Sequence, residues 1–247
     1  MRIGKNIRQA AWFLVKSPQR KIVGIHTLLT DLKGLARMFF LPKPQEKLWV
    51  CVGVYNRSQN ILHGLIPSLL KTDQANQLAL SLVDCGSDDF DHLAAEIQKQ
   101  WPHTCIIKQS IQPFTRAKVF NQAIVQSQGG FIMAMDADMS VPQDLYVRAQ
   151  RNVRKGRAWF PICQWQKEQT SDDWRWFTEG TGLFAALKSD FENVGSYQED
   201  YTQWGKEDWD LFFAFYRKGI CPARTQLNGL YHHWHKSLKP ADFKKWF

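Results

Sequence analysis

Four short apolar segments alternate with helical patterns between residues 48 and 136, and this alternation restricts the possible folds more than any other feature. Residues 48–55, 78–83, 105–108 and 131–135 are apolar runs of strand length. Helical patterns fill residues 58–70, 90–100 and 114–124 between them. Continuous apolar runs are typical of parallel strands covered on both faces. The alternation therefore predicts an α/β fold with a mostly parallel central sheet flanked by helices.

The fourth apolar run ends in two carboxylates, in the stretch FIMAMDADMSVP at residues 131–142. Aspartate is disfavoured inside strands, and buried carboxylates are rare unless they are paired or bind a metal. Open α/β sheets bind ligands at the carboxyl ends of their strands. The pattern leaves two interpretations open for Asp136 and Asp138. They bind a divalent metal that holds a nucleotide diphosphate, or one of them caps a helix after Pro142.

The positive charge of the chain is concentrated at its beginning. Of a net charge of +9, residues 1–48 carry ten Lys/Arg against only Asp31 and Glu46. We therefore predict a basic helical extension over residues 1–45, broken near Ser17 and Gly24, and a separate domain over residues 46–247. Basic residues mixed with apolar ones suit an anionic membrane surface, which we expect residues 1–41 to contact. The alternative is a helical extension that packs on the domain with a solvated basic face. Nucleic acid is not an expected partner, because no nucleic-acid-binding motif is present.

The sequence shows no candidate membrane span or disulfide framework. The first apolar run, residues 10–15, is far shorter than the roughly 20 residues that a span requires. The five cysteines are odd in number and lack paired spacing. We therefore expect no zinc site, and we expect the chain to reside in a reducing cytoplasm.

The second half of the chain is less regular. We expect a helix over residues 145–157 with a solvated basic face, strands over residues 158–163 and 180–187, and a tryptophan-rich loop between them. A helix should follow from residue 204 to 218. Its first-turn acids, Glu207 and Asp208, could simply stabilise the helix N-terminus. Asp88 and Asp89 are expected to cap the helix at residues 90–100.

Five motifs follow one another along the chain: FTRAKVFN at 114–121, DAD at 136–138, GTGLFAALKSDF at 180–191, WGKED at 204–208, and the histidines His232 and His235. In this order they resemble those of the GT-A glycosyltransferases, most of all the β-1,4-galactosyltransferase and chondroitin-type hexosaminyltransferase group. The resemblance covers roughly residues 48–236. Lys206 and Trp209 depart from the family pattern beside the acceptor site.

The resemblance implies metal-dependent, inverting transfer of a hexose or N-acetylhexosamine from a UDP-sugar to an acceptor sugar hydroxyl. It implies that Asp138 binds the metal directly and that Asp136 contacts the metal or the donor ribose. His235 would complete the metal site, with His232 as its partner. Oxygen and imidazole ligands suit Mn²⁺, with Mg²⁺ second.

The resemblance also implies roles for residues around the donor and the acceptor. Asp208 would be the general base, and Glu207 would hydrogen-bond a sugar. Trp204 would stack on the acceptor, while Trp174 and Trp176 could form a lid. The residues expected to contact the nucleotide are Tyr55, Arg57, Asp84 and Arg116.

The expected setting is the synthesis of bacterial capsule or lipopolysaccharide, by a cytoplasmic enzyme on the inner face of the membrane. Its acceptor would be a glycan or glycolipid. Two alternatives stay open: a non-catalytic nucleotide-sugar-binding protein, and a transferase of other specificity, including a retaining one. The sequence does not distinguish among Gal, GalNAc, GlcNAc and Glc as donor sugars, and gives neither linkage nor oligomeric state.

Overall fold

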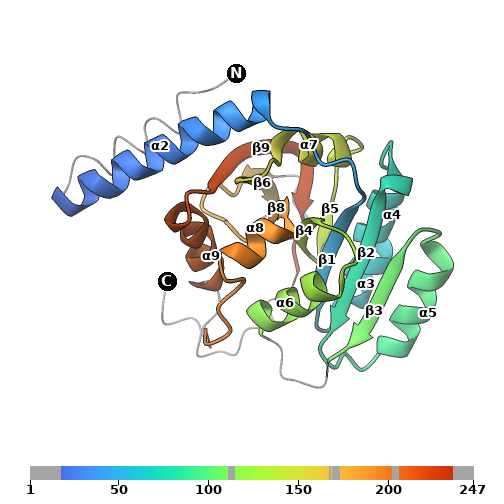
Figure 1. Ribbon diagram of the computed structural model, residues 1–247. Helices are drawn as coiled ribbons and strands as arrows, with labels where there is room; N and C mark the ends of the chain where they lie inside the picture. The colour runs from blue at the N-terminus through green and yellow to red at the C-terminus, as the bar shows by residue number, and fades with distance from the viewer. Residues whose placement is uncertain (1–17, 111–114, 167, 169–172, 202–205, 236–247) are drawn as a thin grey trace.

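One mixed sheet organises the fold. The computed structural model describes residues 18–110, 115–166, 168, 173–201 and 206–235 (Figure 1). Within them the strand order is β3-β2-β1-β4-β8-β6-β9-β5, with β7 paired to β6. The strands are β1 (Leu48–Val54), β2 (Leu78–Asp84), β3 (Cys105–Gln109), β4 (Phe131–Asp136), β5 (Met139–Ser140), β6 (Arg157–Gln166), β7 (Trp174–Trp176), β8 (Phe184–Leu187) and β9 (Cys221–His232).

Helices cover both faces of this sheet, as predicted. One face packs against the helices that follow β1 and β2 and against α7, and the other packs against α6, α8 and α9. The helices are α2 (Pro18–Phe40), α3 (Ser58–Asn60), the π-helical η1 (Ile61–Leu65), α4 (Ile66–Leu70), the 3₁₀ turn η2 (Ala75–Gln77), α5 (Phe90–Gln100), α6 (Arg116–Gln126), α7 (Leu145–Asn152), α8 (Lys188–Asn193) and α9 (Lys206–Arg217).

The half of the sheet formed by β3, β2, β1 and β4 is parallel, which confirms the prediction from the alternating pattern. Val54 pairs with Asp84, and Gly53 pairs with Asp136, so these carboxyl ends meet at one edge. The apolar side chains of β1, β2 and β4 are almost entirely buried, as expected for strands between two helical layers. Antiparallel strands extend the sheet beyond β4: β8 pairs antiparallel with β4, and β6 with β8.

The end of β9 folds back beside the aspartate stretch. Residues 139–140 form the two-residue strand β5, which pairs antiparallel with β9, so that Met139 lies opposite His232. The backbone N–H of His233 donates to the carbonyl of Asp138 at 2.9 Å. This pairing brings together residues that are almost a hundred positions apart in the sequence.

The predicted helix over residues 145–157 is too long, and its basic face is not fully solvated. α7 ends at Asn152, and residue 157 already belongs to β6. Arg154 and Arg157 are only 3% and 7% exposed. The Arg154 guanidinium donates to backbone carbonyls, among them those of Leu41 at 3.0 Å and Gln150 at 2.8 Å. The expectation failed because charge alone does not reveal that a guanidinium binds backbone carbonyl groups inside the fold.

The N-terminal helix also differs from its prediction. α2 continues through Gly24, where a break was expected, and it packs on the domain. Arg37 donates to the carbonyls of Gly156 and Gly219, and the Tyr216 hydroxyl donates to Asp31 at 3.0 Å.

The expected cap of α5 by the Asp89 side chain is absent too, because this carboxylate accepts from the Ser58 hydroxyl at 2.7 Å. Among the described helices, none has the length and apolar character to cross a membrane.

We expect Arg154→Ala to lower the free energy of unfolding by about 1–3 kcal/mol, because buried carbonyls lose their donor. Denaturant unfolding of the purified chain measures this effect. Arg151→Ala is the matched control, since Arg151 is exposed in the last turn of α7, three residues before Arg154. Equal stability of the two variants would show that the Arg154 contacts contribute nothing.

Candidate active site

A carboxylate and two imidazoles meet where β5 pairs with β9. Asp138, His232 and His235 each offer one ligand atom, and these atoms all lie within 4.8 Å of one another. The Asp138 carboxylate is 2.9 Å from His235 Nε2 and 3.3 Å from His232 Nε2. The sequence predicted that these three residues would meet, and the structure brings them together.

The donor set of this cluster fits a divalent cation. Asp138 is buried, and its Oδ1 atom has no hydrogen-bond partner among the described residues. Burial raises the pKa of this carboxyl, but the hydrogen bond from His235 and the charges of His232 and His235 outweigh it and lower the pKa. The carboxylate is therefore ionised and available as a ligand. One carboxylate oxygen and two imidazole nitrogens can together hold a first-row divalent cation.

The other acid of the pair, Asp136, lies outside this cluster and contacts an arginine. Its Oδ1 atom accepts from Arg116 Nη2 at 2.9 Å. The same guanidinium donates to the Asp208 carboxylate and to the carbonyl of Gly182. Arg116 is buried and is stacked over the Phe120 ring at 4.5 Å. It therefore joins the end of β4 to the start of α9, a role that the sequence did not reveal.

Burial and neighbouring charges shift the pKa of the Asp208 carboxyl. Burial raises its pKa, the neighbouring carboxylates of Glu207 and Asp136 add to this effect, and Arg116 opposes it, so that the pKa of Asp208 is about 7. Glu207 is itself buried in the first turn of α9. A carboxyl with a pKa near neutrality can accept and release a proton at physiological pH.

Gly182 allows these groups to approach one another. A Cβ atom at this position would lie 2.9 Å from Arg116 Nη2 and 3.1 Å from Asp208 Oδ2. The sequence offered one signal, since glycines at the start of a strand permit close backbone approach. It did not indicate which groups approach.

Three of the four residues expected to bind the nucleotide lie at the ends of β1 and β2, and the fourth, Arg116, begins α6. Tyr55 is exposed just after β1, and Arg57 Nη2 is 2.9 Å from His235 Nδ1. The buried Asp84 carboxylate accepts from the backbone N–H groups of Gly86 and Ser87 at 2.9 and 2.8 Å. This network shapes the turn after β2, and contact of Asp84 with uracil stays a prediction. Trp204 lies outside the described residues.

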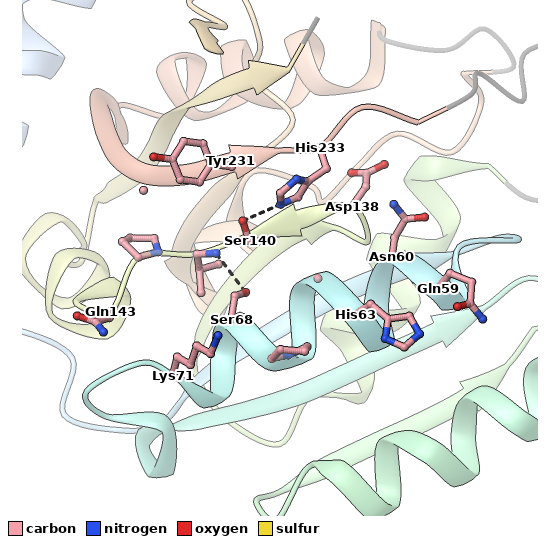
Figure 2. A pocket seen from close by; sticks show the side chains of 15 residues that line it. Gln59, Asn60, His63, Ser68, Lys71, Asp138, Ser140, Gln143, Tyr231 and His233 are labelled. Carbon is pink, nitrogen blue, oxygen red and sulfur yellow. Dashed lines mark hydrogen bonds between the residues drawn. The ribbon is translucent and has the colours of Figure 1, made fainter. Parts of the chain in front are cut away.

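A cavity of about 730 Å³ opens beside Asp138 (Figure 2). Figure 2 shows its two walls, the helical segment from Gln59 to Lys71 and the end of β9 with Tyr231 and His233. Trp174, predicted to belong to a lid, packs against this wall, with its ring 4.6 Å from that of Tyr231 and 5.6 Å from that of His233. The cavity thus has an aromatic ring, amides and hydroxyls close to Asp138, His232 and His235, here termed the metal-type cluster.

Curated proteins with similar sequences include N-acetylgalactosaminyltransferases. A mouse N-acetyl-β-glucosaminyl-glycoprotein 4-β-N-acetylgalactosaminyltransferase 1 is 28% identical over 62% of this chain. Human chondroitin sulfate N-acetylgalactosaminyltransferase 1 is 34% identical over 29% of it. The chain spans only 16% and 14% of the lengths of these relatives.

Solved structures with this fold include complexes with nucleotide sugars. S. aureus TarS has a TM-score of 0.60 at 15% identity, covering 76% of this chain and 60% of that one. The mannosyltransferase PcManGT from Pyrobaculum calidifontis, in complex with GDP-Man and Mn²⁺, has a TM-score of 0.60 at 17% identity, covering 88% and 67%. The fold is therefore that of the GT-A glycosyltransferases. The family model of Glycosyl transferase family 2 matches residues 49–221, which is more than half of the sequence, and the chain belongs to that family.

Proposed function

We propose that this chain is a metal-dependent, inverting glycosyltransferase that moves a hexose or N-acetylhexosamine from a UDP-sugar to an acceptor sugar hydroxyl. The observation that carries the proposal is the cluster of Asp138, His232 and His235 beside the Arg116-linked pair of Asp136 and Asp208. TarS has been solved with UDP and with UDP-GlcNAc, and two relatives are named N-acetylgalactosaminyltransferases, which favours a UDP-sugar donor.

Asp138, His232 and His235 would hold the cation, with Mn²⁺ preferred and Mg²⁺ second. When bound, a divalent cation stabilises the negative charge that develops on a leaving diphosphate. Asp138 suits this task because its ionised form is favoured and one of its oxygens has no hydrogen-bond partner among the described residues. Asp136 is placed beside the cluster, and we retain its predicted contact with the metal or the donor ribose.

Asp208 is the proposed general base. Its Oδ atoms would accept the proton of the acceptor hydroxyl while that oxygen attacks the anomeric carbon. A single displacement with one base and no covalent intermediate inverts the configuration at that carbon. Glu207 would hydrogen-bond a sugar from the first turn of α9. Arg116 would position the base, because it holds Asp208 and Asp136 on one guanidinium.

The donor nucleotide would lie over the ends of β1 and β2, near Tyr55 and Arg57. Arg57 contacts His235, so it links this region to the metal-type cluster. The nucleotide contact expected of Arg116 is retained as a secondary role. The cavity beside Asp138 suits a saccharide, because aromatic rings and fixed polar groups favour such ligands. Trp204 is retained as a proposed acceptor contact.

The proposed setting is the synthesis of bacterial surface polysaccharide, such as capsule or lipopolysaccharide. The enzyme would work in the cytoplasm, with residues 1–41 on the anionic inner face of the membrane and a glycan or glycolipid as acceptor.

A donor panel tests the proposal. UDP-Gal, UDP-GalNAc, UDP-GlcNAc and UDP-Glc are each mixed with the chain, with Mn²⁺ or with chelator, and scored for thermal stabilisation and donor hydrolysis. At least one donor should stabilise the chain only with Mn²⁺, and the anomeric configuration of a transferred sugar should be inverted. Metal-dependent binding with no hydrolysis or transfer for any donor would favour the alternative of a non-catalytic binding protein. Retained configuration would contradict the single displacement.

Gly182→Ala should lower transfer by about tenfold or more, because a 1 Å displacement of catalytic groups can cost about 100-fold. The added methyl group would push the Arg116 guanidinium away from Asp208. The measurement is kcat for a transferable sugar, with the melting temperature as a check on folding. Gly130→Ala is the control, since its Cβ would meet the Glu46 carboxylate at a similar distance of 2.9 Å, just before β4 begins and away from Asp208. Unchanged kcat in Gly182→Ala would show that the Arg116–Asp208 contact is dispensable.

A further inference from the structure

Helix α2 faces the domain with its polar side and faces solvent with its apolar side. Ile25, Leu28, Leu29, Leu32, Leu35 and Phe39 form an exposed row, here termed the α2 stripe. Their spacing of three and four residues places them on one side of the helix. Residues 25–41 contribute eight of the fourteen exposed large hydrophobic side chains in the described part of the chain. Such a concentration marks an interaction surface.

The opposite side of α2 fixes the helix to the domain. Thr30 is buried, and Gly34 lies so close to Cys221 that a Cβ atom would be 2.5 Å from its Sγ. Arg37 reaches the carbonyls of Gly156 and Gly219, and Asp31 accepts from the Tyr216 hydroxyl. Because polar contacts determine which side packs, the α2 stripe is held outward. Figure 1 shows α2 running along the outside of the molecule.

The charges around the stripe select its partner. Residues 1–48 contain ten Lys/Arg and two acids. Both acids are engaged in internal contacts, Asp31 with Tyr216 and Glu46 with the backbone N–H of Gly130. Lys33 is exposed on α2 next to Leu32 of the stripe, and Lys43 is exposed just after the helix. A second copy of the chain would bring like charges together, whereas an anionic lipid surface would bind the cations and cover the apolar row.

We propose that the α2 stripe is a rigid docking surface for a bilayer that contains anionic lipid, with the helix lying in the plane of the interface. The stripe residues would enter the headgroup and acyl boundary. Lys33 would extend its ammonium group toward the lipid phosphates. Docking in this way needs no rearrangement of the domain, because the stripe is already exposed in the folded chain.

This orientation also bears on the acceptor, and that consequence rests on the proposed function. α2 contacts the start of β9 at Cys221, whereas His232 of the metal-type cluster lies at the end of this 12-residue strand. At about 3.3 Å per residue the two ends are up to roughly 35 Å apart. The site can therefore lie up to this distance from the part of α2 that contacts Cys221. The acceptor would reach it as the outer end of a glycan chain.

Vesicle sedimentation of the full chain tests the docking without donor or acceptor, so its outcome is independent of whether the chain transfers sugar. The chain should bind vesicles of equal parts phosphatidylglycerol and phosphatidylcholine, and bind pure phosphatidylcholine weakly. The combined variant Leu29→Gln, Leu32→Gln and Phe39→Gln should reduce the partition coefficient by about tenfold or more. Lys33→Glu should weaken binding to the anionic vesicles only. Val125→Gln, at an exposed apolar residue of α6, is the control and should bind like the original chain.

Melting temperature and solution mass separate the other possible occupants. The combined variant should melt like the original chain, because the three side chains are exposed. A lower melting temperature would mean that another segment of the chain, such as residues 1–17, covers the stripe, and would overturn the proposal. So would a dimer that dissociates in the variant, because the stripe would then bind a second copy. Failure of the original chain to bind anionic vesicles would overturn it directly.

Discussion

Asp208→Asn is expected to reduce the rate of sugar transfer by about 10²–10⁴-fold, because an amide cannot accept the proton of the acceptor hydroxyl. The substitution keeps the size and shape of the side chain beside Arg116. Donor binding in the presence of Mn²⁺ should change little, because Asp208 is not in the metal-type cluster. Single-turnover transfer and calorimetric donor binding, measured on the same preparation, separate the two effects.

The pH dependence of the original enzyme provides an independent check on this base. Burial raises the pKa of Asp208 to about 7, and only the deprotonated carboxylate can accept a proton. The value of kcat/KM should therefore fall about tenfold for each pH unit below this pKa and level off above it. In Asp208→Asn the residual rate should lose this dependence.

Asp210→Asn is the matched control for the base assignment. It lies on the same helix, where Asp210 forms an ion pair with Arg217 at 3.0 Å, away from Arg116. This variant should keep full activity and the original pH profile. Full activity in Asp208→Asn would eliminate Asp208 as the base, and a large loss in Asp210→Asn would show that any lost acid on α9 disturbs the site.

The parallel half of the sheet could be predicted because each of its strands carries a strong local signal. Residues 48–54 and 78–84 are apolar runs of strand length, and both form buried strands. β9 carries no such signal. Its residues Cys221–His232 include proline, glycine and several polar side chains, and none of these polar side chains is fully buried between β6 and β5. Pairing with neighbouring strands, rather than local pattern, makes this segment a strand.

The site could be predicted where a family resemblance supplied the partners, and not where contacts depend on packing. The meeting of Asp138 with His232 and His235 follows the order of motifs, and the structure brings them together. The Arg116 contacts with Asp136 and Asp208 span 20 and 92 positions, and residue types alone gave no sign of them. Similarly, the apolar and basic residues of α2 were evident, but the side that packs was decided by Gly34 and Arg37.

His235→Ala is expected to weaken Mn²⁺ binding by at least about 100-fold, since loss of groups that only orient a metal ligand already costs about 10–100-fold. His235 lies 2.9 Å from the Asp138 carboxylate and also contacts Arg57, so its loss removes a ligand and a link to the donor site. Titration calorimetry with Mn²⁺ alone measures this directly, and Asp138→Ala should show a similar loss.

The control for this prediction is His103→Ala, because His103 lies just before β3 and contacts Trp101, outside the cluster. It should bind Mn²⁺ like the original chain. If His235→Ala also binds Mn²⁺ normally while donor binding fails, Arg57 rather than the metal would explain the importance of His235. If both His235→Ala and Asp138→Ala retain Mn²⁺ affinity and metal-dependent donor binding, the cation must bind elsewhere, and the proposed chemistry at this edge of the sheet would be wrong.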